Sequence, residues 1–301
     1  MLDNHTPAFL SIFLISICYG NNSLLIRVLI NQVDSPDSLN KRFAFLHVAT
    51  NVAAMLGPLI FNILALYWNT ILALEITSFT LVLSAIYSYL YLSTTVISKQ
   101  ENYFKNMRKL LTNKVLLKVY FLIIIAYFFY AQIFSLAPIL LGHTYGLKAY
   151  VWVVGFLNSF ISVIFSLKIN EFFRRRTSIH SQIVSGFIFS ILGFSSLLTI
   201  QSWVGVSMGV IFISLAEIAF IPGFQVILSN TTREDQKVAI FAINALCMGI
   251  GEGFGQYYGV LTSLGAINVY MIVIIYCMLS VGIYLSLSLE RNCFFPSMVA
   301  K

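Results

Sequence analysis

Charged residues are scarce in this sequence. Asp, Glu, Lys and Arg make up 10% of the 301 residues, whereas hydrophobic residues make up 59%. A soluble domain usually has about 25% charged residues. The composition therefore excludes an ordinary soluble domain and favours a protein that spans a lipid bilayer.

Residues that could perform enzymatic chemistry are also few. The sequence has 11 acidic residues and 4 histidines, and these are widely scattered. Active sites need such residues in clusters. His47, His143 and His180 have no partners at a spacing that suits a metal ion, and the four cysteines show no spacing typical of a metal site or a disulfide framework. We therefore expect neither an enzyme nor a bound metal or cofactor.

The formal net charge of +7 comes from basic residues that lie between the apolar segments. This placement is typical of the cytoplasmic loops of a membrane protein, so the charge does not indicate a nucleic-acid partner. Alternate gaps contain nearly all of the Lys and Arg residues, whereas the other gaps contain only Lys148. The asymmetry predicts a multi-pass membrane protein whose C-terminal tail, residues 291–301, is cytoplasmic.

Nine apolar segments follow one another along the chain. A helix needs about 20 such residues to cross a bilayer, and the segments approach or exceed that length. The sequence therefore predicts an all-α membrane protein with about nine transmembrane helices and the lipid bilayer as its main partner. The segments cover residues 8–33, 43–66, 70–95, 117–141, 149–169, 181–199, 203–228, 238–262 and 266–288.

The longest polar stretch lies between the third and fourth segments, at residues 99–116. Tyr103, Met107, Leu110 and Leu111 fall on one face of a helix here, and Lys and Arg fall on the others. The pattern favours a short amphipathic helix on the membrane surface. A plain solvated linker is the alternative.

Three of the charged side chains that lie inside apolar segments are functional candidates. Glu217 lies five residues before Pro222-Gly223, Glu252 lies beside Gly253, and Arg27 lies in the first segment. A charge at the bilayer centre costs about 2.5–3.5 kcal/mol on insertion scales, so such residues usually face a protein interior or a wet pathway. The sequence therefore predicts a polar path across the membrane and a transport function.

Each of these charges has two interpretations. Glu217 either exchanges a proton or contacts substrate, or it is a neutral carboxyl group hydrogen-bonded to another helix. Arg27 either points into a cavity or extends to the lipid headgroups. Glu252 is interpreted as a packing or gating residue, because alternating glycines that suit close helix approach surround it: Gly249, Gly251, Gly253 and Gly255.

Uncharged polar residues inside the segments form a second group of candidates. They can contact a substrate, or they can form hydrogen bonds between helices. The candidates for substrate contact are Tyr130, Gln132, Asn21 and Asn22. Asn51, Asn158 and Asn244 are interpreted as links between helices.

A weak internal repeat relates the first two segments to the seventh and eighth. Shifting the chain by 196 residues superimposes Lys41 on Lys237, Phe45 on Phe241, Gly57 on Gly253 and Asn21 on Glu217. A parallel repeat of six helices has such a period. The first copy then lacks its first three helices.

Three motifs in the sequence resemble those of the major facilitator superfamily. Gly57-Pro58 is similar to the GPxxGG motif in the fifth helix of its drug–proton antiporters. The loop SLKINEFFRRR resembles a family loop motif, with Arg174 and Arg175 as its basic pair and Asn170 where the motif has Asp. Glu217 followed by Pro222 is similar to the tenth helix of several proton-coupled members.

The resemblance implies a transporter whose nine helices correspond to family helices four to twelve. Its expected parts are a truncated three-helix bundle (1–98), a cytoplasmic linker (99–116), a six-helix bundle (117–290) and a tail (291–301). Such proteins move a small solute or drug by alternating access, here with protons, and without an obligate protein partner. A bacterial inner membrane is the expected location. The alternative is a truncated remnant that does not transport.

Overall fold

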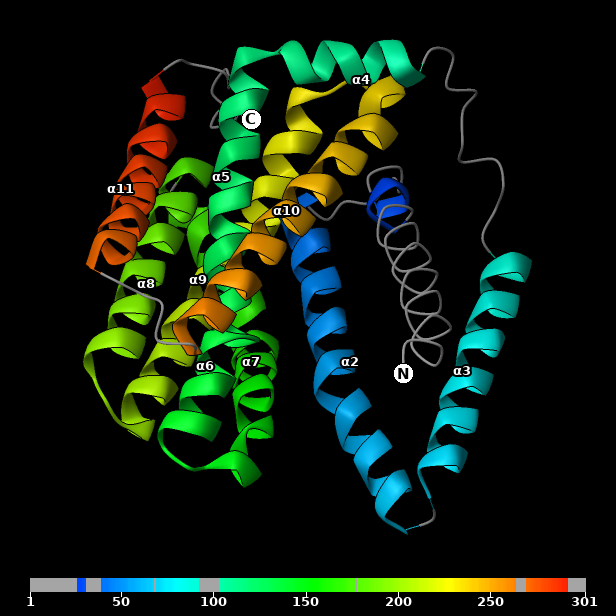
Figure 1. Cartoon of the computed structure of the whole chain (residues 1–301). Coiled ribbons are helices and arrows are strands. Elements are labelled where there is room, and N and C mark those ends of the chain that lie inside the picture. The colour runs from blue at the N-terminus through cyan, green and yellow to red at the C-terminus, as the bar shows by residue number, and fades with distance from the viewer. Residues whose placement is uncertain are drawn as a thin grey trace, which may run out of the picture.

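The computed structural model describes residues 26–30, 39–67, 69–91, 103–176, 178–263 and 269–291, which form helices joined by turns (Figure 1). The prediction of an all-α membrane protein is confirmed for this part of the chain. The long helices are α2 (Leu39–Tyr67), α3 (Thr70–Tyr91), α5 (Lys114–Tyr130), α7 (Trp152–Arg176), α8 (Ile179–Thr199), α9 (Trp203–Thr231), α10 (Lys237–Ser263) and α11 (Val269–Arg291).

Eight of the nine predicted segments coincide with helices, and the first lies mainly outside the described residues. Among the described residues, five stretches are long and apolar enough to cross a membrane, and Glu75–Ser84 and Ile275–Leu287 are shorter apolar helices. α7 continues past the predicted end at residue 169 to Arg176. Basic residues are favourable there, because the last turn of a helix bears a partial negative charge.

The helical segment that begins with α5 changes partway along its length from regular α-helix to 3-10 and π turns. Asn113 caps its start, because the side chain accepts hydrogen bonds from the N–H groups of Val115 and Leu116. A 3-10 turn, Ala131–Ile133, then leads to α6 (Leu136–Ile139) and a π turn, Leu140–Thr144. Pro138 lies in α6 and has no N–H to continue the α-helical pattern. The predicted segment 117–141 is therefore a broken helix, with its break just after Tyr130.

A short helix, α4 (Tyr103–Thr112), occupies the stretch where an amphipathic helix was expected. It lies across the end of the bundle, beside the start of α5 and the loop between α9 and α10 (Figure 1). Leu110 is buried, whereas Phe104 is exposed on the opposite side. The Asn106 side chain donates a hydrogen bond to the Asp235 carbonyl oxygen at 3.3 Å. α4 thus lies across the ends of the helices rather than among them.

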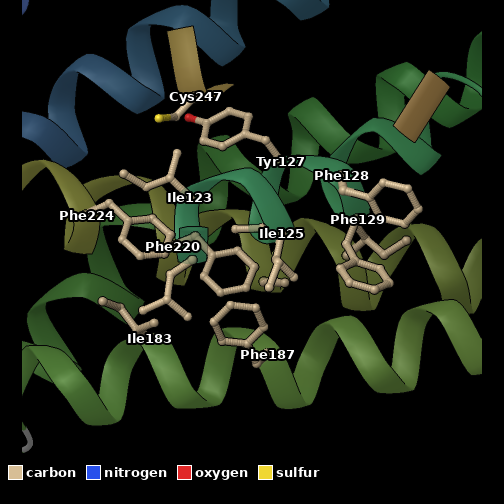
Figure 2. Packing of buried hydrophobic residues seen from close by; sticks show 14 of the residues in the cluster. Ile123, Ile125, Tyr127, Phe128, Phe129, Ile183, Phe187, Phe220, Phe224 and Cys247 are labelled. Atoms are coloured by element: carbon tan, nitrogen blue, oxygen red, sulfur yellow. The ribbon is translucent and has the colours of Figure 1, made fainter. Parts of the chain in front are cut away.

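The core of the bundle is the contact between α8 and α9. Gly193 and Gly209 face each other, so that a Cβ on either would stand about 3 Å from the other's carbonyl oxygen. Farther along the same contact, aromatic rings fill the interface, as Figure 2 shows for Phe187 and Phe220, whose centroids lie 4.8 Å apart. Small residues let the helices approach, and the rings then supply dispersion contacts.

Helix α10 packs on α5 through glycines that recur every four residues. A Cβ on Gly251, Gly255 or Gly259 would collide with Ile124, Phe128 or Ser135, respectively. Gly249 and Gly253 have no described atom within 4 Å of a Cβ position. Residues four apart share a helix face, whereas residues two apart point in nearly opposite directions. Gly251 and Gly255 therefore have the packing role that was expected for Gly253.

We expect Gly255→Ala to lower the free energy of unfolding by about 1–3 kcal/mol, the usual effect of overpacking. The new Cβ would lie 2.5 Å from the Phe128 carbonyl oxygen and 2.7 Å from the Ala131 Cβ. Gly253→Ala is the matched control, and its higher helix propensity should leave stability unchanged or raised by up to about 1 kcal/mol. Unfolding of the purified protein in detergent measures both. Equal effects would contradict the assigned α5–α10 interface.

Candidate functional site

A cavity of about 260 Å³ lies where helices from both ends of the described chain meet. One wall is α2 with the short helical stretch 26–30, and the other is formed by α5, α9 and α10 (Figure 1). Its polar lining consists of Arg27, His47, Thr50, Asn51, Tyr127, Tyr130, Glu217, Gln225 and Glu252. The cavity therefore gathers most of the charged groups that the sequence places at membrane depth.

Glu217 of α9 is the most enclosed acid in this cavity, with an exposed fraction of 3%. Its Oε1 lies 3.7 Å from Nε2 of His47 in α2. Its Oε2 accepts a hydrogen bond from the Ser162 hydroxyl of α7 at 3.4 Å. The side chains of Tyr130 and Asn51 also face the carboxyl group. Three helices, α2, α5 and α7, thus direct polar groups at one carboxyl group of α9.

His47 is one of the site residues that the sequence reasoning missed, as are Thr50, Tyr127 and Gln225. His47 is buried, and the side chain of Asn51, one turn later, donates a hydrogen bond to its carbonyl oxygen at 3.0 Å. The available signal was the pair of polar residues four apart on one face of an otherwise apolar segment. Asn51, expected to link helices, also lines the cavity.

Arg27 and Glu252 form the other charged part of the cavity. Arg27 is 8% exposed and lines the cavity. Its positive charge acts on the carboxyl group of Glu252 in α10. The cavity therefore offers a cation and an anion, with the phenol rings of Tyr127 and Tyr130 beside them.

The remaining candidates for substrate contact are placed differently. Tyr130 lines the cavity. Gln132 does not line it: its side chain is fully buried and donates hydrogen bonds to the carbonyl oxygens of Phe128 at 2.9 Å and Gly255 at 3.1 Å. Gln132 thus ties the broken helix to α10. Asn21 and Asn22 lie outside the described residues.

Pro222, one turn after Glu217, leaves a backbone carbonyl of α9 without its helical partner. Proline has no N–H, so the carbonyl of Ile218 loses its usual donor. The side chain of Asn170 in α7 donates to this oxygen at 3.3 Å. Gln182 of α8 donates to Asn170 Oδ1 at 2.8 Å and to the Ala219 carbonyl oxygen at 3.0 Å. A small polar network therefore supports the backbone next to Glu217.

The other motif residues lie away from the cavity. Gly57-Pro58 fall in the middle of α2, which continues without interruption. Gly223 packs against Ile183 of α8, where a Cβ would meet ordinary contact at 3.4 Å. Arg175 forms an ion pair with Glu171, one turn earlier in α7. The side chain of Arg174 lies outside the described part of the chain.

The described residues contain no group of three or more His, Cys, Asp or Glu side chains that could hold a metal ion. A carboxyl group and an imidazole at 3.7 Å can instead share or exchange a proton. The cation and anion formed by Arg27 and Glu252 can bind the polar ends of a small molecule. The chemistry available in the cavity is thus reversible binding and proton exchange.

The Asn170 contact predicts a coupling between two substitutions. Asn170→Ala should destabilise the protein by about 1–2 kcal/mol, because it leaves the buried Ile218 carbonyl without a donor. In a Pro222→Ala background residue 222 regains an N–H for that carbonyl, so Asn170→Ala should cost about 1 kcal/mol less. Unfolding of the four proteins in detergent completes the cycle. The control is Asn244→Ala, on α10, whose effect on the free energy of unfolding should be additive with that of Pro222→Ala. If the effects of Asn170→Ala and Pro222→Ala are also additive, the contact between Asn170 and the Ile218 carbonyl is refuted.

Comparison with known proteins agrees with this arrangement. No match was found among curated proteins. The sequence profile described as Major Facilitator Superfamily matches residues 2–256, which is most of the chain and includes every residue that lines the cavity. This chain therefore belongs to the major facilitator superfamily, a family of membrane transporters.

Proposed function

We propose that this protein is a secondary active transporter that moves a small solute or drug by alternating access, coupled to protons through Glu217. Its family supports transport of a small molecule across a membrane. The observation that carries the finer proposal is the buried carboxyl group of Glu217 in a polar cavity, 3.7 Å from the imidazole of His47. An enzyme would need a reactive cluster, and the cavity offers binding and proton-exchange groups instead.

The proton-coupling argument rests on the cost of charge at membrane depth. A carboxylate without a counter-charge is unfavourable there, so Glu217 needs a proton, a protonated His47 or a cationic group of the solute. Binding of any one of these three changes the affinity of the site for the other two. Such mutual dependence is the thermodynamic requirement for coupling solute movement to a proton gradient.

The cavity also constrains the solute. A volume of about 260 Å³ suits a small organic molecule. Arg27 and Glu252 can bind opposite ends of a polar or zwitterionic compound, and Tyr127 and Tyr130 offer aromatic faces. We therefore expect a compact solute with at least one polar group rather than a purely apolar one.

The arrangement in the membrane completes the proposal. The helices before residue 98 and the six crossings of 117–290 would form the two moving parts, joined by the linker at 99–116. The basic end of the bundle, with the tail at 291–301, would face the cytoplasm, and the membrane would be the inner membrane of a bacterium. Alternating access would then expose Glu217 to each side in turn.

Glu217→Gln tests the coupling role. We expect proton-coupled transport to fall to background, because glutamine keeps the shape of glutamate but cannot release a proton. The measurement uses proteoliposomes containing a pH-sensitive dye and compounds first selected by thermal stabilisation of the protein. Exchange of solute without a pH gradient should persist, which separates lost coupling from lost folding.

Glu171→Gln is the matched control, because it removes a carboxyl group from α7 outside the cavity. It should leave coupled transport within about twofold of the unmodified protein, since such a change is well below 1 kcal/mol. Undiminished proton movement with Glu217→Gln would eliminate this residue as the coupling site.

Arg27→Gln tests the binding role of the opposite charge. We expect the KM for a polar solute to rise about tenfold with kcat little changed, because a lost contact of about 1.4 kcal/mol weakens binding by that factor. Arg42→Gln is the control, because Arg42 donates its hydrogen bond to the Ile30 carbonyl oxygen and does not line the cavity. An equal change in both variants would argue against a binding role for Arg27.

A further inference from the structure

A second pocket, of about 270 Å³, lies between α2 and α7 and shares no lining residue with the Glu217 cavity. Each helix supplies four of its lining residues. The α2 residues belong to its first two turns, which begin at Leu39, and the α7 residues precede the basic end of that helix. The pocket therefore lies at the basic end of the helices and not at their middle.

The charges around this pocket are mainly positive. Lys41 of α2 and Lys168 of α7 both line it, and both are exposed. Glu171 also lines it, but its carboxylate forms an ion pair with Arg175. Together, Lys41, Lys168, Glu171 and Arg175 have a formal charge of +2, and the positive end of the α2 dipole adds to it. An anion is the complementary ligand.

A buried polar group faces the same space. Asn40 lines the pocket with an exposed fraction of 8%, and its Oδ1 has no hydrogen-bond partner among the described residues. A buried polar atom without a partner is unfavourable. Because the oxygen and nitrogen of an asparagine amide exchange places when the amide rotates by half a turn, Asn40 can present N–H groups to an anion in the pocket.

Asn170 also lines the pocket, with its amide hydrogen-bonded inside the protein, and the rest of the wall is apolar. Ala44, Phe45 and Leu167 form it, and Phe45 is half exposed. The Lys41 ammonium lies 5.8 Å from the centroid of the Phe45 ring, so charge and apolar surface adjoin. A soluble phosphate ester gains nothing from an apolar wall, whereas a phospholipid can cover it with its acyl chains.

We propose that the α2–α7 pocket binds the phosphate group of an anionic membrane phospholipid. Lys41 and Lys168 contact the phosphate oxygens from the two helices, Asn40 donates from the wall, and the acyl chains lie on Phe45 and Leu167. Because the lipid contacts both helices, it stabilises the packing of α2 on α7. The site shares no lining residue with the Glu217 cavity.

Native mass spectrometry of the full chain in neutral detergent tests this site, with dioleoyl phosphatidylglycerol as the probe. The test variant is Lys41→Gln with Lys168→Gln, and the matched control is Lys105→Gln with Lys109→Gln, which removes two exposed lysines of α4. We expect the pocket variant to weaken lipid binding about 10- to 30-fold, from about 1 kcal/mol for each lysine. The control should change it less than about threefold, under 1 kcal/mol.

A second variant and a second probe separate the alternatives. Asn40→Leu should also weaken lipid binding without altering surface charge. sn-Glycerol 3-phosphate, which has no acyl chains, should neither bind measurably nor displace the lipid. Equal losses in the pocket and α4 variants would show diffuse attraction and overturn the site. Binding of glycerol 3-phosphate that depends on Lys41 and Lys168 would overturn the lipid as the ligand, and unmodified protein that retains no phosphatidylglycerol would overturn the proposal altogether.

Discussion

Removing a polar group from water without giving it a partner costs several kcal/mol in hydrocarbon, and the structure around Glu217 is arranged to avoid that cost. His47 comes from α2, Ser162 from α7 and Tyr130 from α5, and all approach the same carboxyl group. The same constraint explains Asn170, which donates to the carbonyl that Pro222 leaves without its helical donor. The contacts between these helices and the arrangement of the candidate site therefore both follow from the requirement that buried polar groups have partners.

Close packing of small residues provides the rest of the framework. Helices in a bilayer gain little from hydrophobic association, because lipid is as apolar as they are, so short backbone distances and dispersion contacts stabilise the bundle. Gly193 and Gly209 serve this purpose between α8 and α9, as do Gly251 and Gly255 between α10 and α5. Glu252 follows Gly251 by one residue and is therefore turned toward the cavity. The face of α10 that packs on α5 therefore determines which face of this helix lines the cavity.

The sequence predicts the fold better than the site. Helix positions follow from apolar length, and α8 ends at Thr199 as predicted. Glu217, Arg27 and Glu252 stand out because charge inside an apolar segment needs a reason. His47 did not stand out, because an isolated histidine has many possible surroundings. Gln132 was placed among the substrate contacts, yet a break in its helix leaves nearby carbonyls to be satisfied, and its amide is used there.

By itself the sequence determined that this is a membrane protein, where most of its helices lie, and which few charges must be kept from lipid. These properties depend on the composition and the length of each segment, so they can be determined from one segment at a time. The tertiary structure decided which partner each polar group meets: His47 for Glu217, Glu252 for Arg27, and Asn170 for the carbonyl beside Pro222. Each pair joins helices distant in sequence, and a rotation of about 100° per residue decides whether two side chains meet or diverge.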